Sequence, residues 1–175
     1  MCFNITLIGK NGKMQKLNRI IIHWTAGTNQ PNNTDFEHYH FLVNGDGVLF
    51  NGKYVPEDNI DCKDGKYAQH TGQGNTGSIG IAVCGMYGFN EKQMKTKYPL
   101  TQIQCEKLFF EVARLCKKYS ISIDNVTTHY EFNQKHNIKT GKIDIIYLPP
   151  YPQIRKENIA DFIRNKILWY YKRIV

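Results

Sequence analysis

Three apolar stretches along the chain have the pattern of β-strands. The first, RIIIHW at 19–24, contains three successive isoleucines and ends in His23 and Trp24. A continuous run of β-branched residues is typical of a central strand that is covered on both faces. The stretches SIGIAVCG at 78–85 and ISIDNVTTH at 121–129 read as further strands, and the second of these again ends in a histidine. We therefore predict that two strands of one sheet end in histidine.

Two segments alternate apolar and polar residues around a glycine-containing turn. Residues 3–17 predict a hairpin with Asn11-Gly12 as its turn, because this dipeptide favours the left-handed backbone of a tight hairpin. Residues 39–54 predict a second hairpin, which turns at the sequence NGDG of residues 44–47. Because two hairpins occur among the alternating strands and helices, we expect a mixed rather than a purely parallel sheet.

Helical spacing of apolar residues appears in the second half of the chain. Thr101 followed by Gln104 predicts a capping box that begins a helix. The residues predicted to form its apolar stripe are Ile103, Leu108, Phe109, Val112, Leu115, Cys116 and Tyr119. A last helix is predicted at about 156–172, with Ile159, Phe162, Ile163, Ile167, Tyr170 and Tyr171 on one face. Residues 29–41 hold a loop and at most a short helix that is capped by Thr34.

The order of these elements predicts an α/β fold. We expect a single domain over residues 1–175, with a central mixed β-sheet and helices packed on it. The chain is long enough to bury a hydrophobic core without disulfides or a structural metal. Its five cysteines are Cys2, Cys62, Cys84, Cys105 and Cys116, and no CxxC motif occurs. We expect free, mostly buried thiols.

The charge balance indicates an anionic partner. Lys and Arg total 23 against 15 Asp and Glu, which gives a net charge of +8 and a pI near 9.2. No RNA-binding aromatic signature or zinc-finger spacing supports nucleic acid. No apolar stretch of 18 residues predicts a transmembrane helix, and we expect no stable membrane insertion. The last helix is basic and aromatic, but we interpret it as a docking helix with a solvated far side rather than as a membrane-surface helix.

Two histidines at strand ends are half of a zinc site. His23 and His129 would meet if their strands are neighbours, because the ends of parallel strands lie at one edge of a sheet. A catalytic zinc needs a third protein ligand and one open position. Glu131, His136 and Asp144 are the candidates downstream of His129, and their spacing does not choose among them.

Five pieces of the sequence recur in a known order along residues 19–148. They are IIIHWTAGT, HYHFLVNGDGVLFNG, AQHTGQGNTGSIGIAVCG, THYEF and GKID. In this order they resemble type 2 N-acetylmuramoyl-L-alanine amidases, a family that includes amidase-type phage lysozymes and peptidoglycan recognition proteins. The resemblance implies Zn²⁺ as cofactor, with His23, His129 and Asp144 as its ligands. It also places Lys142 and Tyr39 at the catalytic centre. The chain departs from the family at Ile145, where a proline is usual, and has a longer interval between His129 and Asp144 than the phage lysozymes.

The resemblance further implies a cleft and a substrate. His70, Asn75 and Ser78 fall along the cleft, and we expect Trp24, directly after the first ligand, to contact substrate as well. The implied reaction is hydrolysis of the amide bond between N-acetylmuramic acid and L-alanine in peptidoglycan. Tyr39 is expected to hold or deprotonate the water or to donate to the oxyanion, and Lys142 to stabilise the oxyanion. His38, His40 and His136 are interpreted as structural.

Two other functions remain open from the sequence. One is a peptidoglycan-binding module that cuts nothing, against which Asp144 argues, and the other is a zinc peptidase that cuts within the stem peptide. The N-terminal residues lack the apolar run of a signal peptide. We expect a monomer of the phage or prophage endolysin type, made in the cytoplasm and acting on the cell wall after its release.

Overall fold

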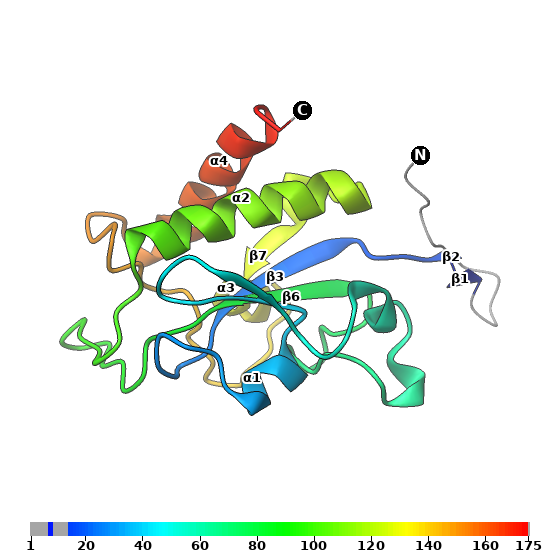
Figure 1. Ribbon diagram of the computed structural model, residues 1–175, viewed down its shortest axis with the longest axis horizontal. Coiled ribbons are helices and arrows are strands. Elements are labelled where there is room, and N and C mark those ends of the chain that lie inside the picture. Colours follow the sequence, from blue (N-terminus) through cyan, green and yellow to red (C-terminus); the bar gives the residue numbers. More distant parts are fainter. Residues whose placement is uncertain (1–6, 9–13, 175) are drawn as a thin grey trace.

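Five strands form a mixed sheet at the centre of the computed structural model, which describes residues 7–8 and 14–174 (Figure 1). Across the sheet the strands are β5 (Leu49–Asn51), β4 (Phe41–Val43), β6 (Ser78–Val83), β3 (Arg19–Trp24) and β7 (Val126–Thr128). All neighbours are parallel except β4 and β5, which form the predicted second hairpin. The predicted single-domain α/β architecture with a mixed sheet is confirmed.

The strand order brings the two histidines to one edge of the sheet. Strand β3 lies between β6 and β7, and Ile22 of β3 is paired with Thr128 of β7. His23 and His129 are each the next residue along the chain. Parallel pairing in this register therefore places them side by side, as predicted from the two strand endings.

The alternation of side chains along β3 separates two faces. Ile20, Ile22 and Trp24 belong to the main core, which lies beneath α2 (Gln102–Tyr119) and α4 (Ile159–Tyr171). His23 must point to the opposite face, because successive side chains of a strand alternate. Figure 1 shows α2 and α4 stacked over one face of the sheet and α1 (Asn33–His38) on the other side.

The predicted start of α2 is confirmed. Thr101 is its N-cap, and the Thr101 and Gln104 side chains each bond the other's backbone in a capping box. The amide of Gln104 also donates to the Val43 carbonyl at 2.7 Å and to the Cys84 carbonyl at 2.8 Å, which ties the helix to β4 and β6. Ile103 does not join the buried stripe and is 63% exposed, because the first turn of the helix lies at the rim beside the β4–β5 turn.

Two segments differ from the sequence prediction because side chains cap the backbone there. The predicted strand at 121–129 is extended only at Val126–Thr128; a 3₁₀ turn, η3, occupies Ile123–Asn125, and α3 (His129–Lys135) begins directly at His129. Ser122 caps η3 and Thr128 caps α3. The short helix α1 is capped by Asn32, in a capping box with Asp35, rather than by Thr34.

The remaining elements are short. Strands β1 (Leu7–Ile8) and β2 (Met14–Gln15) pair antiparallel, as expected of the first hairpin, whose turn lies outside the described residues. Three further 3₁₀ turns are η1 (Pro56–Asn59), η2 (Cys62–Asp64) and η4 (Lys156–Asn158). Cys62, Cys84, Cys105 and Cys116 are free thiols, as predicted, while Cys2 lies outside the described part of the chain. None of the described helices is long and apolar enough to cross a membrane.

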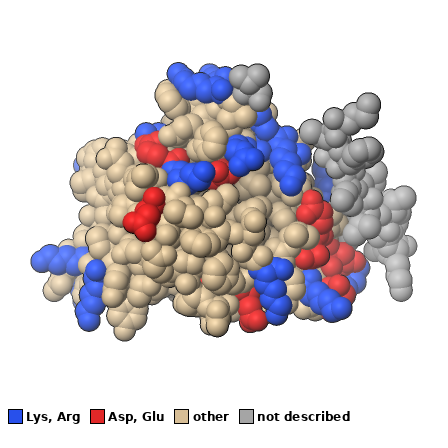
Figure 2. All heavy atoms as spheres, viewed as in Figure 1, with Lys and Arg blue, Asp and Glu red and all other residues tan. Residues whose placement is uncertain are grey.

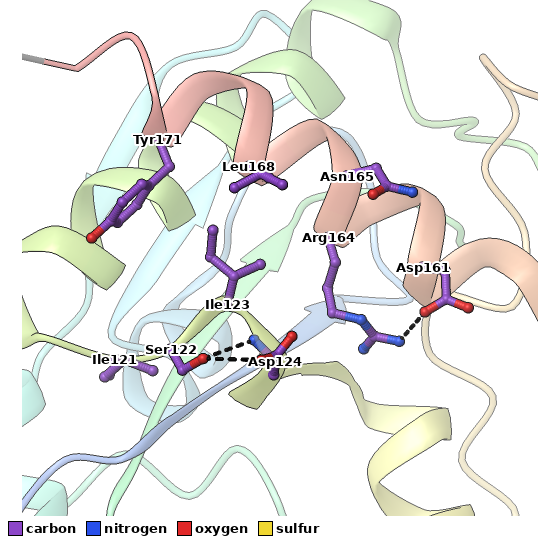
Figure 3. Close-up of a pocket in the computed structure, with 9 residues that line it drawn as sticks. All are labelled: Ile121, Ser122, Ile123, Asp124, Asp161, Arg164, Asn165, Leu168 and Tyr171. Atoms are coloured by element: carbon purple, nitrogen blue, oxygen red, sulfur yellow. Dashed lines mark hydrogen bonds and ion pairs between the residues drawn. The ribbon is translucent and has the colours of Figure 1, made fainter.

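The C-terminal helix α4 is held by buried isoleucines and by two polar clusters. Ile159, Ile163 and Ile167 are its buried residues, and the helix packs on α2. In one cluster, Arg164 donates to both carboxylate oxygens of Glu131, at 2.8 and 3.0 Å, and to the carbonyl of Val126. A hollow of about 670 Å³ between η3 and α4 is lined by Arg164 and by none of the predicted site residues. Figure 3 shows the residues that line it.

The second cluster centres on Glu106 of α2. Its carboxylate accepts hydrogen bonds from Tyr151 and Lys166 at 2.5 Å and from Tyr170 at 2.7 Å. Burial alone raises the pKa of Glu106, but the three hydrogen bonds outweigh burial and hold the pKa below its usual value of 4.5. The charged carboxylate is therefore the form that holds α4 on α2.

We expect Glu106→Gln to lower the free energy of unfolding by about 1–3 kcal/mol at pH 7. A group whose pKa is depressed by folding contributes its full stabilisation above the pKa of the unfolded state and loses it as the pH falls through the folded-state pKa. The difference in the free energy of unfolding between the wild type and the variant should therefore narrow below pH 4.5. Urea unfolding at several pH values measures this difference.

Glu91→Gln is the control, because it removes an exposed ion pair with Lys156. Its effect should stay below about 0.5 kcal/mol at every pH. A gap for Glu106→Gln that is independent of pH would contradict the assignment of the charged carboxylate as the stabilising form.

Candidate metal centre and catalytic site

Three residues that are far apart in the sequence converge at the end of β3. Oδ2 of Asp144 lies 3.1 Å from Nδ1 of His23 and 2.9 Å from Nδ1 of His129. All three residues are buried, and their candidate ligand atoms lie within 4.8 Å of one another. The structure thus chooses Asp144 among the three downstream candidates that the residues alone left open.

Each of the three side chains is set by local structure. His23 projects from β3, and His129 is the first residue of α3, whose N-cap Thr128 bonds the backbone of Glu131. Asp144 follows an irregular loop, and its carbonyl accepts from the backbone N–H of Tyr130 at 3.4 Å. The end of this loop is thereby fastened to the first turn of α3.

The backbone after Asp144 explains the departure from the family pattern. Ile145 has a φ of +64°, in the left-handed region, and its side chain is buried. Proline is fixed near a φ of −65° and cannot occupy this position. A β-branched residue at positive φ is strained, at a cost on the order of 1–3 kcal/mol that surrounding packing must offset. Ile145 and Ile146 both pack in the main core, which supplies that packing.

The electrostatics of the cluster suit a cation. Burial lowers the pKa of His23 to about 4, against the opposing effect of its hydrogen bond to Asp144. Burial raises the pKa of Asp144, but its hydrogen bonds to His129 and His23 outweigh this and bring the pKa far below its usual value. At neutral pH the site therefore offers a neutral imidazole and a carboxylate. These are the forms in which both residue types bind zinc, so the donor set fits a three-ligand zinc site.

Tyr39 and Lys142 lie near the cluster. Tyr39 ends α1, and its ring centroid is 5.2 Å from that of His23. Burial, with a further effect from the charge of Asp144, raises the pKa of Tyr39, so it stays a neutral phenol. Lys142 is exposed, and its charge is near enough to lower the pKa of His23.

Most of the chain, including this cluster, matches one protein-family model. The family model for N-acetylmuramoyl-L-alanine amidase matches residues 13–145, which include both histidines and Asp144. The chain belongs to this family. A search of curated proteins gives no significant match.

Solved structures share the fold at low sequence identity. A single-residue mutant of PlyL is 22% identical with a TM-score of 0.53, and the match covers 88% of this chain and 86% of that chain. The catalytic domain of PlyG is 18% identical with a TM-score of 0.51, covering 90% and 84%. The Ph2119 endolysin, from the Thermus scotoductus MAT2119 bacteriophage Ph2119, is 17% identical with a TM-score of 0.52, covering 86% and 84%.

Two of the four residues expected to bind substrate lie in the loop before β6. His70 is 6% exposed, and its Nδ1 lies 3.3 Å from Nε2 of His23. Asn75 is half-buried, and its side chain accepts from the backbone N–H of Thr71 at 2.8 Å. His70 thus contacts a predicted metal ligand, while Asn75 holds the loop that carries it.

The other two positions require a correction. Trp24 follows His23 in a strand, so it points to the opposite face, where it is 3% exposed and packs against Phe89. Ser78 is fully buried, and its hydroxyl bonds the Gly74 carbonyl and accepts from Arg19. Neither side chain faces the cluster, so the expectation that Trp24 and Ser78 contact substrate is wrong.

Sequence reasoning missed Thr71 and the space that Gly80 provides. Thr71 Oγ1 lies 3.3 Å from Nε2 of His23 and 2.9 Å from Nδ1 of His70. A Cβ on Gly80 would lie 2.3 Å from Cγ of His70, so only glycine leaves room for this ring. His40 is structural, as predicted, because its two ring nitrogens bond Asn59 and the backbone of Gly80. No sequence signal identifies Thr71, since its partner lies 48 positions away.

We expect Gly80→Ala to displace His70 and to destabilise the protein by about 1–3 kcal/mol, as overpacking of a buried site does. Urea unfolding measures the loss. Gly72→Ala is the matched control in the same loop, because a Cβ there meets nothing within 4 Å. Equal stability of the two variants would show that the loop adjusts freely around His70.

Proposed function

We propose that the protein hydrolyses the amide bond between N-acetylmuramic acid and L-alanine in peptidoglycan, with Zn²⁺ held by His23, His129 and Asp144. The observation that carries the proposal is the convergence of these three buried side chains in a member of the amidase family. A family member that only bound the wall would have no need of a buried carboxylate between two imidazoles. The Ph2119 endolysin, which shares the fold, supports a role of the endolysin type.

His23, His129 and Asp144 would hold the metal. When bound, zinc supplies Lewis acidity, which makes a water molecule nucleophilic near neutral pH. The chain supplies the orientation of the ligands and the exclusion of bulk water around His23, which is fully buried. Lys142 is exposed near this buried centre, and we infer that the amide carbonyl of the substrate approaches from its side.

The raised pKa of Tyr39 argues against one of its expected roles and leaves the other two. A phenol whose pKa is raised holds its proton at neutral pH, so Tyr39 is unsuited to deprotonate water. It can donate a hydrogen bond, and its position beside His23 suits donation to the oxyanion or to a bound water. Lys142 is exposed and would bring a positive charge to the same oxyanion.

The surface charge supports an anionic substrate without indicating nucleic acid. The net charge of the chain is +8. On the face shown in Figure 2, the Lys and Arg side chains lie in several separate groups, with Asp and Glu among them. A nucleic-acid-binding protein more often presents a continuous basic stripe, whereas scattered positive charge suits general attraction to an anionic cell wall.

Digestion of purified cell wall tests the reaction. We expect new free amino groups on L-alanine, intact glycan strands and released stem peptides, with no new reducing sugar ends. Mass spectrometry of the soluble and insoluble fractions identifies these products. New termini inside the stem peptide would show a peptidase instead, and binding without any product would show a recognition module.

Two substitutions separate the roles of Asp144 and Lys142. Asp144→Ala removes a ligand, so we expect bound zinc and activity to be lost together. Lys142→Ala should keep the zinc and lose roughly 10²–10³-fold in kcat, as removal of an oxyanion-stabilising group does. Elemental analysis and wall-clearing rates measure the two effects. Retention of zinc by Asp144→Ala would exclude Asp144 as a ligand, and full activity of Lys142→Ala would exclude the lysine from catalysis.

A further inference from the structure

The far side of the His23 ring has two hydrogen-bonding partners outside the proposed ligand set, His70 and Thr71, and the family resemblance gives no role to Thr71. Nδ1 of His23 faces Asp144, whereas Nε2 faces the loop before β6. Nε2 lies 3.3 Å from Oγ1 of Thr71 and 3.3 Å from Nδ1 of His70. These two atoms are themselves 2.9 Å apart, so the three groups form a closed triangle.

If Nδ1 of His23 binds a metal, the position of the remaining ring proton decides which groups of this triangle donate and which accept. Nδ1 must then be unprotonated, and Nε2 carries the proton and needs an acceptor. A hydroxyl accepts and donates at the same time, so Thr71 can accept from His23 and donate to Nδ1 of His70. The second bond is the shorter one, at 2.9 Å. His70 would then carry its own proton on Nε2.

The hydroxyl also serves the other tautomer of His23. When the proton is on Nδ1, that nitrogen donates to Asp144 and Nε2 becomes an acceptor. Thr71 then donates to it by rotating its hydroxyl hydrogen. An imidazole that has to exchange tautomers as metal binds requires a neighbour of this kind, because a group that can only donate or only accept would leave one state unsatisfied.

The position of Thr71 is fixed by its surroundings. Its side chain is fully buried, so water does not substitute for it. Its backbone N–H donates to Oδ1 of Asn75 at 2.8 Å, and its carbonyl accepts from the N–H of Gly74 at 3.0 Å. The ring of His70, which contacts the Thr71 hydroxyl, occupies the space that a side chain on residue 80 would fill. The loop therefore presents the hydroxyl to His23 in one orientation.

We propose that Thr71 is a positioning residue that holds His23 with Nδ1 directed at the metal. This inference rests on the proposed zinc amidase function and deepens it, since it names the group that sets the tautomer and orientation of the first ligand. Hydrogen-bond partners of metal-bound histidines contribute about 10–100-fold to metal affinity. Thr71 acts through His23 and has no assigned contact with substrate.

Thr71→Val tests the proposal, because valine keeps the shape and removes the hydroxyl. We expect zinc to bind about 10-fold more weakly, at the lower end of that range, because Nδ1 of His70 remains 3.3 Å from Nε2 of His23. Thr71→Ser keeps the hydroxyl and should restore the affinity. Competition with a chromogenic zinc chelator measures the affinity, and the visible absorption of bound Co²⁺ reports the ligand geometry.

Thr127→Val is the matched control. Thr127 is a buried threonine of β7 whose hydroxyl has no hydrogen-bond partner among the described residues, and it forms no part of the site. Its zinc affinity and Co²⁺ spectrum should equal those of the wild type. Urea unfolding of each metal-free variant verifies the fold, and Thr71→Ala carries the same expectation should the valine variant not fold.

The outcomes separate this inference from the proposed function. A wild-type protein that binds no zinc overturns the proposed function and this inference with it. A wild type that binds zinc, beside a folded Thr71→Val with the same affinity and spectrum, overturns the role of Thr71 alone. Weak binding by both Thr71→Val and Thr71→Ser would assign the effect to loop packing and also overturn the proposal.

Discussion

A single carboxylate oxygen joins the parts of the chain on which the site depends. Oδ2 of Asp144 lies within hydrogen-bonding distance of two buried imidazoles, one from β3 and one from the start of α3. An isolated buried carboxylate is very costly, so its burial requires partners that compensate the charge. Both histidines therefore have to lie where they do, and the sheet register, the cap of α3 and the loop to residue 144 all serve this arrangement.

The backbone after Asp144 shows how this constraint extends into the core. Asp144 turns towards the histidines, while Ile145 and Ile146 turn into the main core. The chain reverses between these two environments at a residue with a φ of +64°. Strain of this kind persists only where packing holds it, and the two buried isoleucines provide such packing. The longer loop after His129 thus ends in a turn that couples the site to the core.

Sequence reasoning recovered the features that follow from local rules. The two strands with terminal histidines, the second hairpin and the capping box of Thr101 were all predictable, because each depends on neighbouring residues. The start of α3 was not, since Thr128 caps a helix that begins at His129, where only the end of a strand was expected. Trp24 directly follows His23 in the sequence, but neighbours in a strand face opposite sides of the sheet, so adjacency to His23 does not place Trp24 at the site. The proposed third ligand, Asp144, needed the family resemblance, because spacing alone does not specify the path of a loop.

Thr71 illustrates why the surroundings of a proposed metal ligand are harder to predict than the ligand itself. A metal ligand must be one of a few residue types, so a histidine at a strand end stands out in the sequence. Its hydrogen-bond partner can be any donor or acceptor that the fold delivers, and here the fold delivers a hydroxyl from a loop held by Asn75. Gly80 meets a steric requirement, because the His70 ring fits only where residue 80 has no side chain. The alternation that buries Ile22 and Trp24 on one face of β3 leaves His23 on the other, where the loop before β6, the end of α1 and the turn at Asp144 meet around one ring.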